Sequence, residues 1–384
     1  MKRNRKYLLV LAAVLSAAVL AACSVEVETP ETPDAATVTE ITEPASDETE
    51  PADTETFAEP EAEDSAEEEQ TAETEEPKEV YYNRFTGLPA SEQISKIRPL
   101  AVMINNIQIA TPQQGISMAD VIYEVLAEGG ITRLLCIFTD YANLPETGSI
   151  RSSRDYFIDL AEANDAIYIH CGGSPAAYET LKSRKNDHID GIFDSTTFYR
   201  NQIRAMQMGY EHSLMSDGER LAAAVARYGF RDTSESTPFA FNETDTPFEG
   251  DGAVYVKVPY STYTTAEFTY DAETKVYSKK QFGKDHIDGN TGEAITFKNI
   301  VLIPVSQGQV AGDDKGRLFV NFFGEGKGTY ISDGVSKPIV WKRADRRSSY
   351  TLYEADGKTE LLMNPGITYV GLPPKNAAVT IFAE

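Results

Sequence analysis

Arginine and carboxylate side chains gather in one stretch of the sequence, between residues 120 and 170. Arg151 and Arg154 lie three positions apart at the predicted start of a helix. Two guanidinium groups so placed could bind an anion bidentately, helped by the free backbone N–H groups of the helix terminus. The same residue types also form ordinary structural ion pairs, so the sequence leaves both interpretations open. The candidate ligand-binding residues are Asp120, Glu124, Glu128, Arg133, Arg151, Arg154, Asp155 and His170.

No complete catalytic or metal-binding motif accompanies this set. The three cysteines and four histidines lack the close spacing of a zinc signature, so we expect no metal and no other cofactor. Ser174 lies outside any Gly-x-Ser-x-Gly elbow of the kind that serine hydrolases use. Cys171, next to His170, is better explained as a small buried thiol than as a nucleophile. The sequence therefore leaves open whether the protein is an enzyme.

A predicted β-hairpin positions the first half of the candidate set. Residues 121–127 and 131–140 are rich in β-branched and other apolar side chains, and Gly129–Gly130 supplies the positive φ values of a tight turn. By the period of two, Glu124 and Glu128 share one face of the first strand, and Arg133 lies across the turn from them.

Three helices are predicted after this hairpin. Ser153 is expected to cap a helix over residues 154–163, and Ser174 with Pro175 is expected to open a second helix. Ser216 and Glu219 have the spacing of a capping box, and the third helix should end at Gly229.

The predicted fold class is α+β. Short Tyr-, Val- and Phe-rich segments follow one another from residue 252 onward, which favours a sandwich or a curled sheet. Gly324, Gly326 and Gly328 are interpreted as turn glycines, because no helix follows them as a nucleotide-binding loop requires. We predict a mixed α/β domain over 80–235, a connector over 236–251 and a β-rich domain over 252–384.

The N-terminal residues predict export and lipidation. A cationic start and an apolar stretch lead to Leu20-Ala21-Ala22-Cys23, which resembles a lipobox, so residues 1–22 are expected to be a lipoprotein signal peptide. The resemblance implies a diacylglyceryl group on Cys23 and a position at the outer face of the bacterial cytoplasmic membrane. Residues 23–79 form an acidic linker that should stay disordered, since it has too few apolar side chains to build a core.

The net charge of the chain argues against one class of binding partner, nucleic acid. The chain carries 60 Asp and Glu against 35 Lys and Arg, with a formal net charge of -25. We therefore expect no binding of nucleic acid through a basic surface. Beyond residue 22 no apolar run reaches bilayer-spanning length, which argues against a multi-pass membrane protein.

Specific multi-residue runs occur in both predicted domains: Arg98 to Asn106, Ala119-Asp120, Tyr123-Glu124, Glu128 to Arg133, Ile150 to Arg154, Gly172 to Pro175, Glu211 to Ser213, Trp341-Lys342 and Asn364-Pro365-Gly366. These runs resemble the YerB-type family of bacterial lipoproteins, a two-domain family of essentially unknown function. The resemblance covers both predicted domains and implies location and architecture more firmly than chemistry. Where the family tends to have Pro-His-Asn, this chain has Glu211-His212-Ser213, which weakens any role for His212.

A more distant resemblance rests on the order of four segments: Ala119-Asp120, Arg133 to Phe138, Ile150 to Asp155 and Gly172-Gly173. This order is similar to that of the motifs of the LytR-CpsA-Psr phosphotransferases. It implies that Arg151 and Arg154 neutralise the phosphates of a polyprenyl-linked wall polymer while Asp120 and Asp155 hold Mg²⁺.

We nevertheless expect an anchored binding module for an envelope ligand or a membrane-protein partner. The phosphotransferase and a structural scaffold for membrane proteins are the alternatives.

Overall fold

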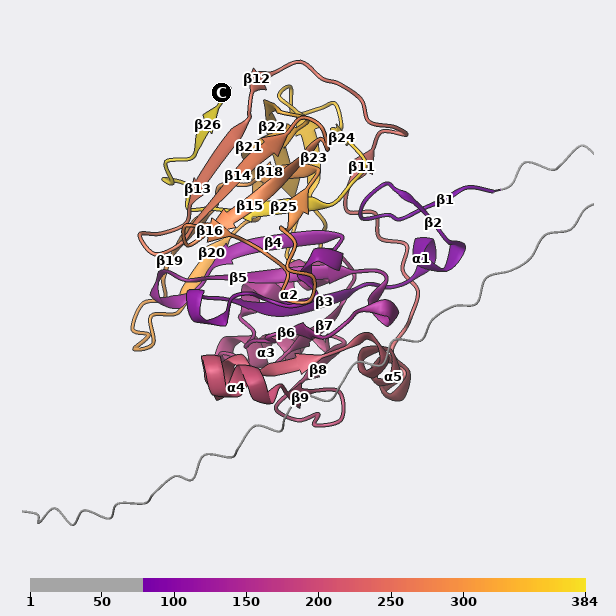
Figure 1. Cartoon of the computed structure of the whole chain (residues 1–384), viewed down its shortest axis with the longest axis vertical. Helices are drawn as coiled ribbons and strands as arrows, with labels where there is room; N and C mark the ends of the chain where they lie inside the picture. The colour runs from indigo at the N-terminus through magenta and orange to yellow at the C-terminus, as the bar shows by residue number, and fades with distance from the viewer. Residues whose placement is uncertain (1–78) are drawn as a thin grey trace, which may run out of the picture. The chain divides into compact units, whose positions relative to one another are not determined.

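An eleven-stranded mixed sheet forms the centre of the fold (Figure 1). The computed structural model describes residues 79–384, so the predicted signal peptide, Cys23 and almost all of the acidic linker lie outside the described residues. The sheet runs in the order β12-β22-β21-β18-β25-β4-β5-β3-β7-β8, with β23 paired to β22. Its strands are β3 (Leu100–Asn106), β4 (Val121–Leu126), β5 (Thr132–Phe138), β7 (Ile167–His170), β8 (His188–Asp190), β12 (Asp251–Gly252), β18 (Asn299–Leu302), β21 (Gly324–Ser332), β22 (Val335–Arg343), β23 (Thr351–Glu354) and β25 (Thr368–Leu372).

Strand direction decides which side chains reach the same edge of this sheet. β3 and β4 each pair antiparallel with β5, so they run parallel to one another. β7 runs parallel to β3, and β8 runs parallel to β7. The carboxyl ends of β4, β3, β7 and β8 therefore share one edge, where β5 begins.

The two faces of the sheet belong to two different cores. On β3, Ala101 and Met103 pack in one core with side chains of α2 (Asp155–Ala163) and α3 (Pro175–Arg184). Val102 and Ile104 point the other way and pack in a core with a second sheet. This alternation is the period of two that a doubly covered strand requires. The second sheet comprises β13 (Tyr255–Pro259), β14 (Thr265–Asp271), β15 (Val276–Gln281), β16 (Lys284–Asp285), β17 (Thr296–Phe297) and β26 (Thr380–Phe382).

Smaller elements surround these layers. A three-stranded sheet joins β6 (Thr147–Gly148), β10 (Leu214–Ser216) and β9 (Tyr199–Arg200), and the remaining strands pair in twos. Those pairs are β1 (Tyr81–Tyr82) with β2 (Pro89–Ala90), β11 (Ala240–Phe241) with β24 (Leu362–Met363), and β19 (Ser306–Gln309) with β20 (Leu318–Asn321). The other helices are α1 (Glu92–Lys96), α4 (Gln202–Met208) and α5 (Gly218–Tyr228).

Helix starts were only partly predictable. Ser174 caps α3 as expected, its Oγ accepting from the N–H of Ala177 at 3.1 Å. The predicted cap Ser153 is wrong, because the N-cap of α2 is Arg154, whose side chain accepts no capping bond. Ser216 is also wrong as a cap, since it belongs to β10. The residue after it, Asp217, caps α5.

The prediction that Gly324, Gly326 and Gly328 are turn glycines was wrong, because all three belong to β21, of which Gly324 is the first residue. Gly326 and Gly328 lie inside β21, paired with Trp341 and Ile339 of β22. A Cβ at Gly326 would lie 2.7 Å from the Trp341 ring, and one at Gly328 would lie 2.6 Å from the carbonyl oxygen of Leu302. These glycines let an indole ring and a neighbouring strand approach the backbone closely.

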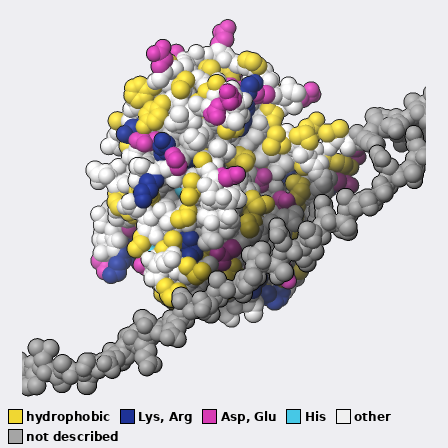
Figure 2. All heavy atoms as spheres, in the orientation of Figure 1, with side chains coloured by type: hydrophobic (Ala, Val, Ile, Leu, Met, Phe, Trp, Pro, Cys, Tyr) yellow, Lys and Arg dark blue, Asp and Glu magenta, His cyan; other side chains and the backbone are white. Residues whose placement is uncertain are grey.

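The predicted α+β class is confirmed, and the hairpin is confirmed as β4 and β5. The main sheet takes strands from both predicted domains, because β25 pairs with β4, and the positions of the domain boundaries stay a prediction. None of the helices within residues 79–384 is long and apolar enough to cross a membrane. On the face shown in Figure 2, Lys and Arg side chains alternate with Asp and Glu side chains and with apolar groups.

Candidate functional site

Three of the predicted arginines come together at the edge where β4 ends and β5 begins. Arg154 bonds to Glu128 through two nitrogens, of which Nη2 lies 2.8 Å from Oε2. Arg133 lies on β5, just after the turn that contains Glu128. Its Nη2 lies 3.8 Å from the same Oε2 of Glu128. Arg133 also donates to the backbone carbonyl of Ser152, the residue after Arg151. We call Arg133, Arg151 and Arg154 the arginine cluster.

Arg151 is the member of the cluster that faces solvent. Its Nη2 lies 3.0 Å from Oε2 of Glu211, and the Glu211 side chain is 65% exposed. An ion pair with such an exposed partner is weak, because water screens the attraction. Glu211 can therefore be displaced from Arg151 at little cost in free energy.

The cluster holds more positive charge than its carboxylates balance. Three guanidinium groups share Glu128 and Glu211. Burial, together with the nearby charge of Arg154, lowers the pKa of Arg133 to about 10. Nε of Arg133 is buried and has no hydrogen-bond partner among the described residues. An anion bound beside the partly exposed Arg151 would offset the excess positive charge of the cluster.

His170 lies at the same edge, at the end of β7, but its imidazole is already engaged. Nδ1 lies 2.9 Å from the carbonyl oxygen of Gly172, which can only accept, so Nδ1 carries the proton. Nε2 then accepts from Nδ1 of His188 at 3.0 Å. Burial lowers the pKa of His170 to about 4, so the ring is neutral near pH 7. The backbone connects it to the cluster, since Cys171 N–H donates to the carbonyl of Arg151.

Asp120, Glu124 and Asp155 do not join the arginine cluster. Asp120 precedes β4, at the opposite end of this strand from Glu128, a span of about 20 Å at the usual rise per residue. It accepts from Thr139 and Asn83, and burial raises its pKa to about 6. Asp155, the first residue of α2, directly follows Arg154, but among the described residues no hydrogen bond or ion pair joins its side chain to the three arginines. The Asp120–Asp155 pair that the phosphotransferase interpretation needs is not assembled.

The hairpin register explains why Glu124 is separate from Arg133. Arg133 pairs with Val125, and Glu124 pairs with Leu134, so Glu124 and Arg133 point to opposite faces of the sheet. Arg133 points to the face covered by α2, and Glu124 points to the second sheet. The expectation that the two side chains meet across the turn is therefore wrong.

Glu124 belongs instead to a buried polar network between the two sheets. Its Oε2 lies 2.9 Å from Nζ of Lys279 on β15, and both side chains are at most 1% exposed. Tyr369 donates to the same oxygen at 2.9 Å. Lys279 also donates to Gln281 at 2.6 Å and contacts His286 at 3.3 Å. The network comprises Glu124, Lys279, Gln281, His286, Gln113, Asn106, Thr132, Tyr369 and Tyr260.

The sequence contained one signal for this network that was missed. On β15, Tyr277, Lys279 and Gln281 alternate with half-buried or exposed positions, so all three face inward. A lysine at an inward position of a strand requires a buried partner. The alternation could have identified Lys279, although not its partner.

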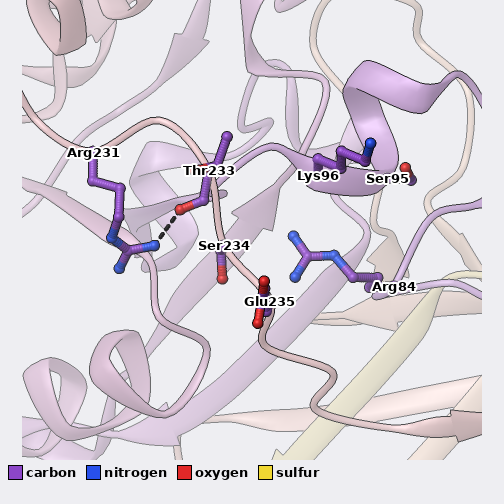
Figure 3. A pocket seen from close by; sticks show the side chains of 7 residues that line it. All are labelled: Arg84, Ser95, Lys96, Arg231, Thr233, Ser234 and Glu235. Carbon is purple, nitrogen blue, oxygen red and sulfur yellow. Dashed lines mark hydrogen bonds between the residues drawn. The ribbon is translucent and has the colours of Figure 1, made fainter.

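A second basic feature is a cavity of about 780 Å³ lined by Arg84, Lys96 and Arg231 (Figure 3). In Figure 3 the Arg84 side chain reaches toward Glu235, and Arg231 bonds to Thr233. Arg84 donates to two backbone carbonyls at 2.9 Å. Arg231 and Lys96 each pair with a carboxylate. Glu235 in the lining, together with Glu92 and Asp165, the partners of Lys96 and Arg231, balances its three cations, which makes this cavity a weaker anion site than the arginine cluster.

Oxygen, nitrogen and sulfur ligands do not converge into a metal site within residues 79–384. No group of three or more His, Cys, Asp and Glu side chains in that range could hold a metal ion. Burial raises the pKa of Cys171, so its thiol is protonated near pH 7 and is a poor nucleophile.

Comparison with known proteins gives a consistent relationship. Residues 85–231 match the family model described as "Protein of unknown function (DUF3048) N-terminal domain", and residues 256–370 match the model of its C-terminal domain. The chain is 31% identical over 302 residues to "Putative lipoprotein YerB" of Bacillus subtilis (strain 168), covering 77% of this chain and 87% of that protein.

A solved structure agrees with the sequence match. The crystal structure of the YerB protein from Bacillus subtilis superposes with a TM-score of 0.69 at 28% identity, covering 78% of this chain and 99% of that chain. Both family segments and nearly the whole relative are therefore accounted for. The chain belongs to the DUF3048 family of YerB-like lipoproteins, whose function is unknown.

Proposed function

We propose that the protein is a binding protein of the bacterial cell envelope whose arginine cluster binds an anionic group of an envelope ligand. A diacylglyceryl group on Cys23 would hold it at the outer face of the cytoplasmic membrane, so the ligand would be an extracytoplasmic molecule. The lipobox-like residues and the likeness to a lipoprotein support the anchor.

The observation that carries the binding proposal is the unbalanced charge of the cluster. Arg133 is 6% exposed, keeps an Nε without a partner among the described residues and lies beside two further guanidinium groups. Arg151 is 25% exposed and gives the ligand access through a replaceable partner. Phosphate and carboxylate both suit such donors. Teichoic polymers carry phosphate and peptidoglycan carries carboxylate, so purified polymers of both kinds are the probes.

Replacing Arg151 by alanine is expected to weaken binding to the preferred polymer by roughly 10- to 100-fold. A hydrogen bond to a charged group contributes about 1.5–3 kcal/mol, which corresponds to that range. Glu211→Gln should have the opposite sign and strengthen binding by about two- to fivefold, because it removes a competing exposed carboxylate. Cosedimentation with wall polymer at two salt concentrations measures both effects.

Arg347→Ala is the matched control for Arg151→Ala. Arg347 is an exposed arginine whose Nε lies 3.5 Å from Glu162, near the other end of α2 from the cluster. Its loss should leave binding unchanged. Equal binding by wild type, Arg151→Ala and Arg347→Ala would show that the cluster is not the site.

The anchor has a separate test. Cys23→Ser removes the thiol that carries the diacylglyceryl group, so the variant should leave the membrane fraction of fractionated cells. Two acyl chains provide the double signal that stable membrane attachment needs. Full retention of Cys23→Ser in the membrane fraction would contradict lipid anchoring without touching the binding proposal.

A further inference from the structure

Five large apolar side chains project into solvent at the end of the fold where α4 and β9 lie (Figure 1). Each is at least 60% exposed, and Phe193 and Met206 reach 79% and 80%. Side chains exposed to this degree stand out from the surface and do not line a groove. Single exposed apolar residues are common on proteins, but a group of them marks a binding surface. We call this group the apolar strip: Ile192, Phe193, Ile203, Met206 and Tyr210.

The apolar face of α4 is turned outward, and its charged residue is turned inward. Ile203 and Met206 are three positions apart and share the exposed face, and Tyr210 follows four positions later. Arg204 is the one charged residue of this helix, and it is 5% exposed. Its guanidinium donates to two backbone carbonyls of the segment after β3, both at 2.8 Å. These bonds hold α4 in the orientation opposite to that of an ordinary surface helix, which buries its apolar side.

A turn after β8 presents the other two members of the strip. The backbone N–H of Ile192 donates to the carboxylate of Asp190 at 2.9 Å, and the N–H of Phe193 donates to the Asp190 carbonyl at 2.9 Å. The Phe193 ring also meets the ring of Tyr178 edge-on, with the two centroids 6.5 Å apart. The turn is therefore held in place with its apolar side chains outward.

Strand β10 connects this turn to α4. A Cβ at Gly191 would lie 2.9 Å from the Leu214 side chain, so the turn packs against β10. Leu214 in turn pairs with Arg200 of β9, which directly precedes Asn201, the N-cap of α4. Both parts of the apolar strip thus belong to one surface.

A positive charge lies beside the strip. The Arg200 guanidinium lies 4.2 Å from the centre of the Tyr210 ring and donates to the Tyr210 carbonyl at 2.7 Å. No carboxylate of residues 79–384 forms an ion pair with Arg200, which is partly exposed. Its remaining donors can therefore bind a phosphate. Exposed aromatic and aliphatic side chains next to a cation are the composition of surfaces that bind acyl chains and anionic lipid headgroups together.

We propose that the apolar strip docks the folded part of the protein onto the outer leaflet of the membrane, with its apolar side chains among the acyl chains and Arg200 at a lipid phosphate. Tyr210 suits the boundary between the two, where tyrosine is enriched. The proposal rests on the lipid anchor at Cys23 and is independent of the arginine cluster. A flexible chain as long as residues 23–79 averages about 40 Å end to end, so the anchor would keep the strip near the lipid. A weak contact is then sufficient, because the tether raises its effective concentration.

Lipid suits the strip better than a protein partner does. A protein binds strongly where an anchor residue fills a matching pocket of the partner. The strip instead offers separate projecting side chains from a turn and from a helix. A bilayer accepts such side chains in any arrangement, because its acyl chains have no fixed shape to match.

A tryptophan placed in the strip reports the docking directly. The lipidated protein is reconstituted into vesicles of phosphatidylglycerol and phosphatidylcholine whose acyl chains carry bromine, which quenches tryptophan on contact. Phe193→Trp should be quenched at least about twofold more strongly than Phe382→Trp, because side chains at a membrane interface reach about 5–10 Å into the bilayer. Phe382 is an exposed residue of β26, at the opposite end of the fold in Figure 1. The native Trp341 is 3% exposed and gives the same background in both variants.

Met206→Gln tests the apolar contacts without disturbing the fold, since the Met206 side chain lies almost wholly in solvent. In the Phe193→Trp protein it should lower the ratio of docked to undocked molecules by roughly tenfold, because a methionine side chain leaves the acyl chains. Met118→Gln makes the same change at an exposed position three residues before β4 and should leave that ratio unchanged.

Arg200→Ala tests the charge. It should lower the docked ratio by roughly fivefold in vesicles that contain phosphatidylglycerol and much less in phosphatidylcholine alone, because only the former surface is anionic. Arg347→Ala removes an equal charge beside Glu162, which precedes β7, and should have no effect.

Equal quenching of Phe193→Trp and Phe382→Trp in protein that sediments with the vesicles would overturn the docking proposal and leave the anchor intact. Unchanged quenching in Met206→Gln would overturn it too. If the tryptophan at position 193 is shielded from iodide in whole membranes but not in vesicles, a protein covers the strip and the proposal is wrong. Protein that is absent from the vesicle fraction would overturn the anchor, and this proposal with it.

Discussion

Replacing Lys279 by methionine is expected to lower the free energy of unfolding by about 3–5 kcal/mol. Glu124 would remain between the two sheets as a buried carboxylate without its cation, since its Oε2 lies 2.9 Å from Nζ of Lys279. Gln281 would also lose the donor that satisfies its Oε1. Urea denaturation followed by circular dichroism measures the loss.

Lys280→Met is the matched control, because the two lysines are neighbours on β15. The Lys280 side chain is 48% exposed, and its Nζ lies 3.6 Å from the exposed Asp285. A surface pair of this kind contributes about 0–1 kcal/mol, so Lys280→Met should be nearly neutral. Equal losses in the two variants would contradict a buried ion pair at Glu124.

The double variant Glu124→Gln with Lys279→Met separates the pair from its surroundings. Removing both charges leaves no uncompensated ion, so the double variant should be more stable than Lys279→Met alone. The amide oxygen introduced at position 124 could still accept from Tyr369 or Thr132, which donate to Glu124 in the native chain. A double variant less stable than Lys279→Met would mean that the carboxylate is held mainly by these hydroxyl groups.

Local patterns predicted the parts of the fold that local physics determines. Gly129 and Gly130 have φ of 68° and 76°, the positive values that the hairpin turn requires, and β4 pairs with β5 as expected. Ser174 caps α3 because it directly precedes Pro175, which suits the first turn. In each case the determining contacts lie within a few residues of one another.

Contacts between distant segments were not predictable from such patterns. Tyr369 and Glu124, which share a hydrogen bond, are 245 positions apart, and no local spacing relates them. The pairing of β25 with β4 likewise joins segments that are far apart in the sequence. The period of two places Lys279 inward, but only the packing of one sheet on the other brings Glu124 to it.

In the candidate site, too, the sequence predicted the local features and missed the effect of the chain's path through the fold. Arg151 and Arg154 were predicted from their spacing at a helix start, and Arg133 from the hairpin. The structure joins Arg133 and Arg154 through Glu128, and Arg133 bonds to the backbone carbonyl of Ser152, next to Arg151. Asp120 was grouped with them because it is near in sequence, yet a whole strand separates it from Glu128. Proximity in sequence fails wherever an extended strand intervenes, since each residue advances the chain by about 3.3 Å.

Acid is expected to destabilise the protein through its buried histidines. His170 has a pKa of about 4 in the folded chain against an ordinary value near 6.5, because burial disfavours its charged form. Below pH 6.5 the unfolded chain takes up a proton that the folded chain refuses, so stability falls as the pH drops toward 4. Complete titration of this one residue corresponds to about 3 kcal/mol.

The other groups with shifted pKa values determine how clearly this loss is seen. His188, His212 and His286 also have lowered pKa values, all through burial, so they add to it. Asp120 acts with the opposite sign. Its pKa of about 6 means that the folded chain takes up a proton first, so its contribution to stability grows as the pH falls from 6 toward 4.

His170→Asn isolates the contribution of this imidazole. The asparagine amide can replace Nδ1 as the donor to Gly172, but it does not titrate, so the variant should lose about 2–3 kcal/mol less than the parent between pH 7 and pH 4.5. Urea unfolding at a series of pH values gives both curves. Parallel curves would mean that His170 accepts a proton in the folded chain, where its Nε2–H would donate to Nδ1 of a neutral His188 ring that carries its own proton on Nε2.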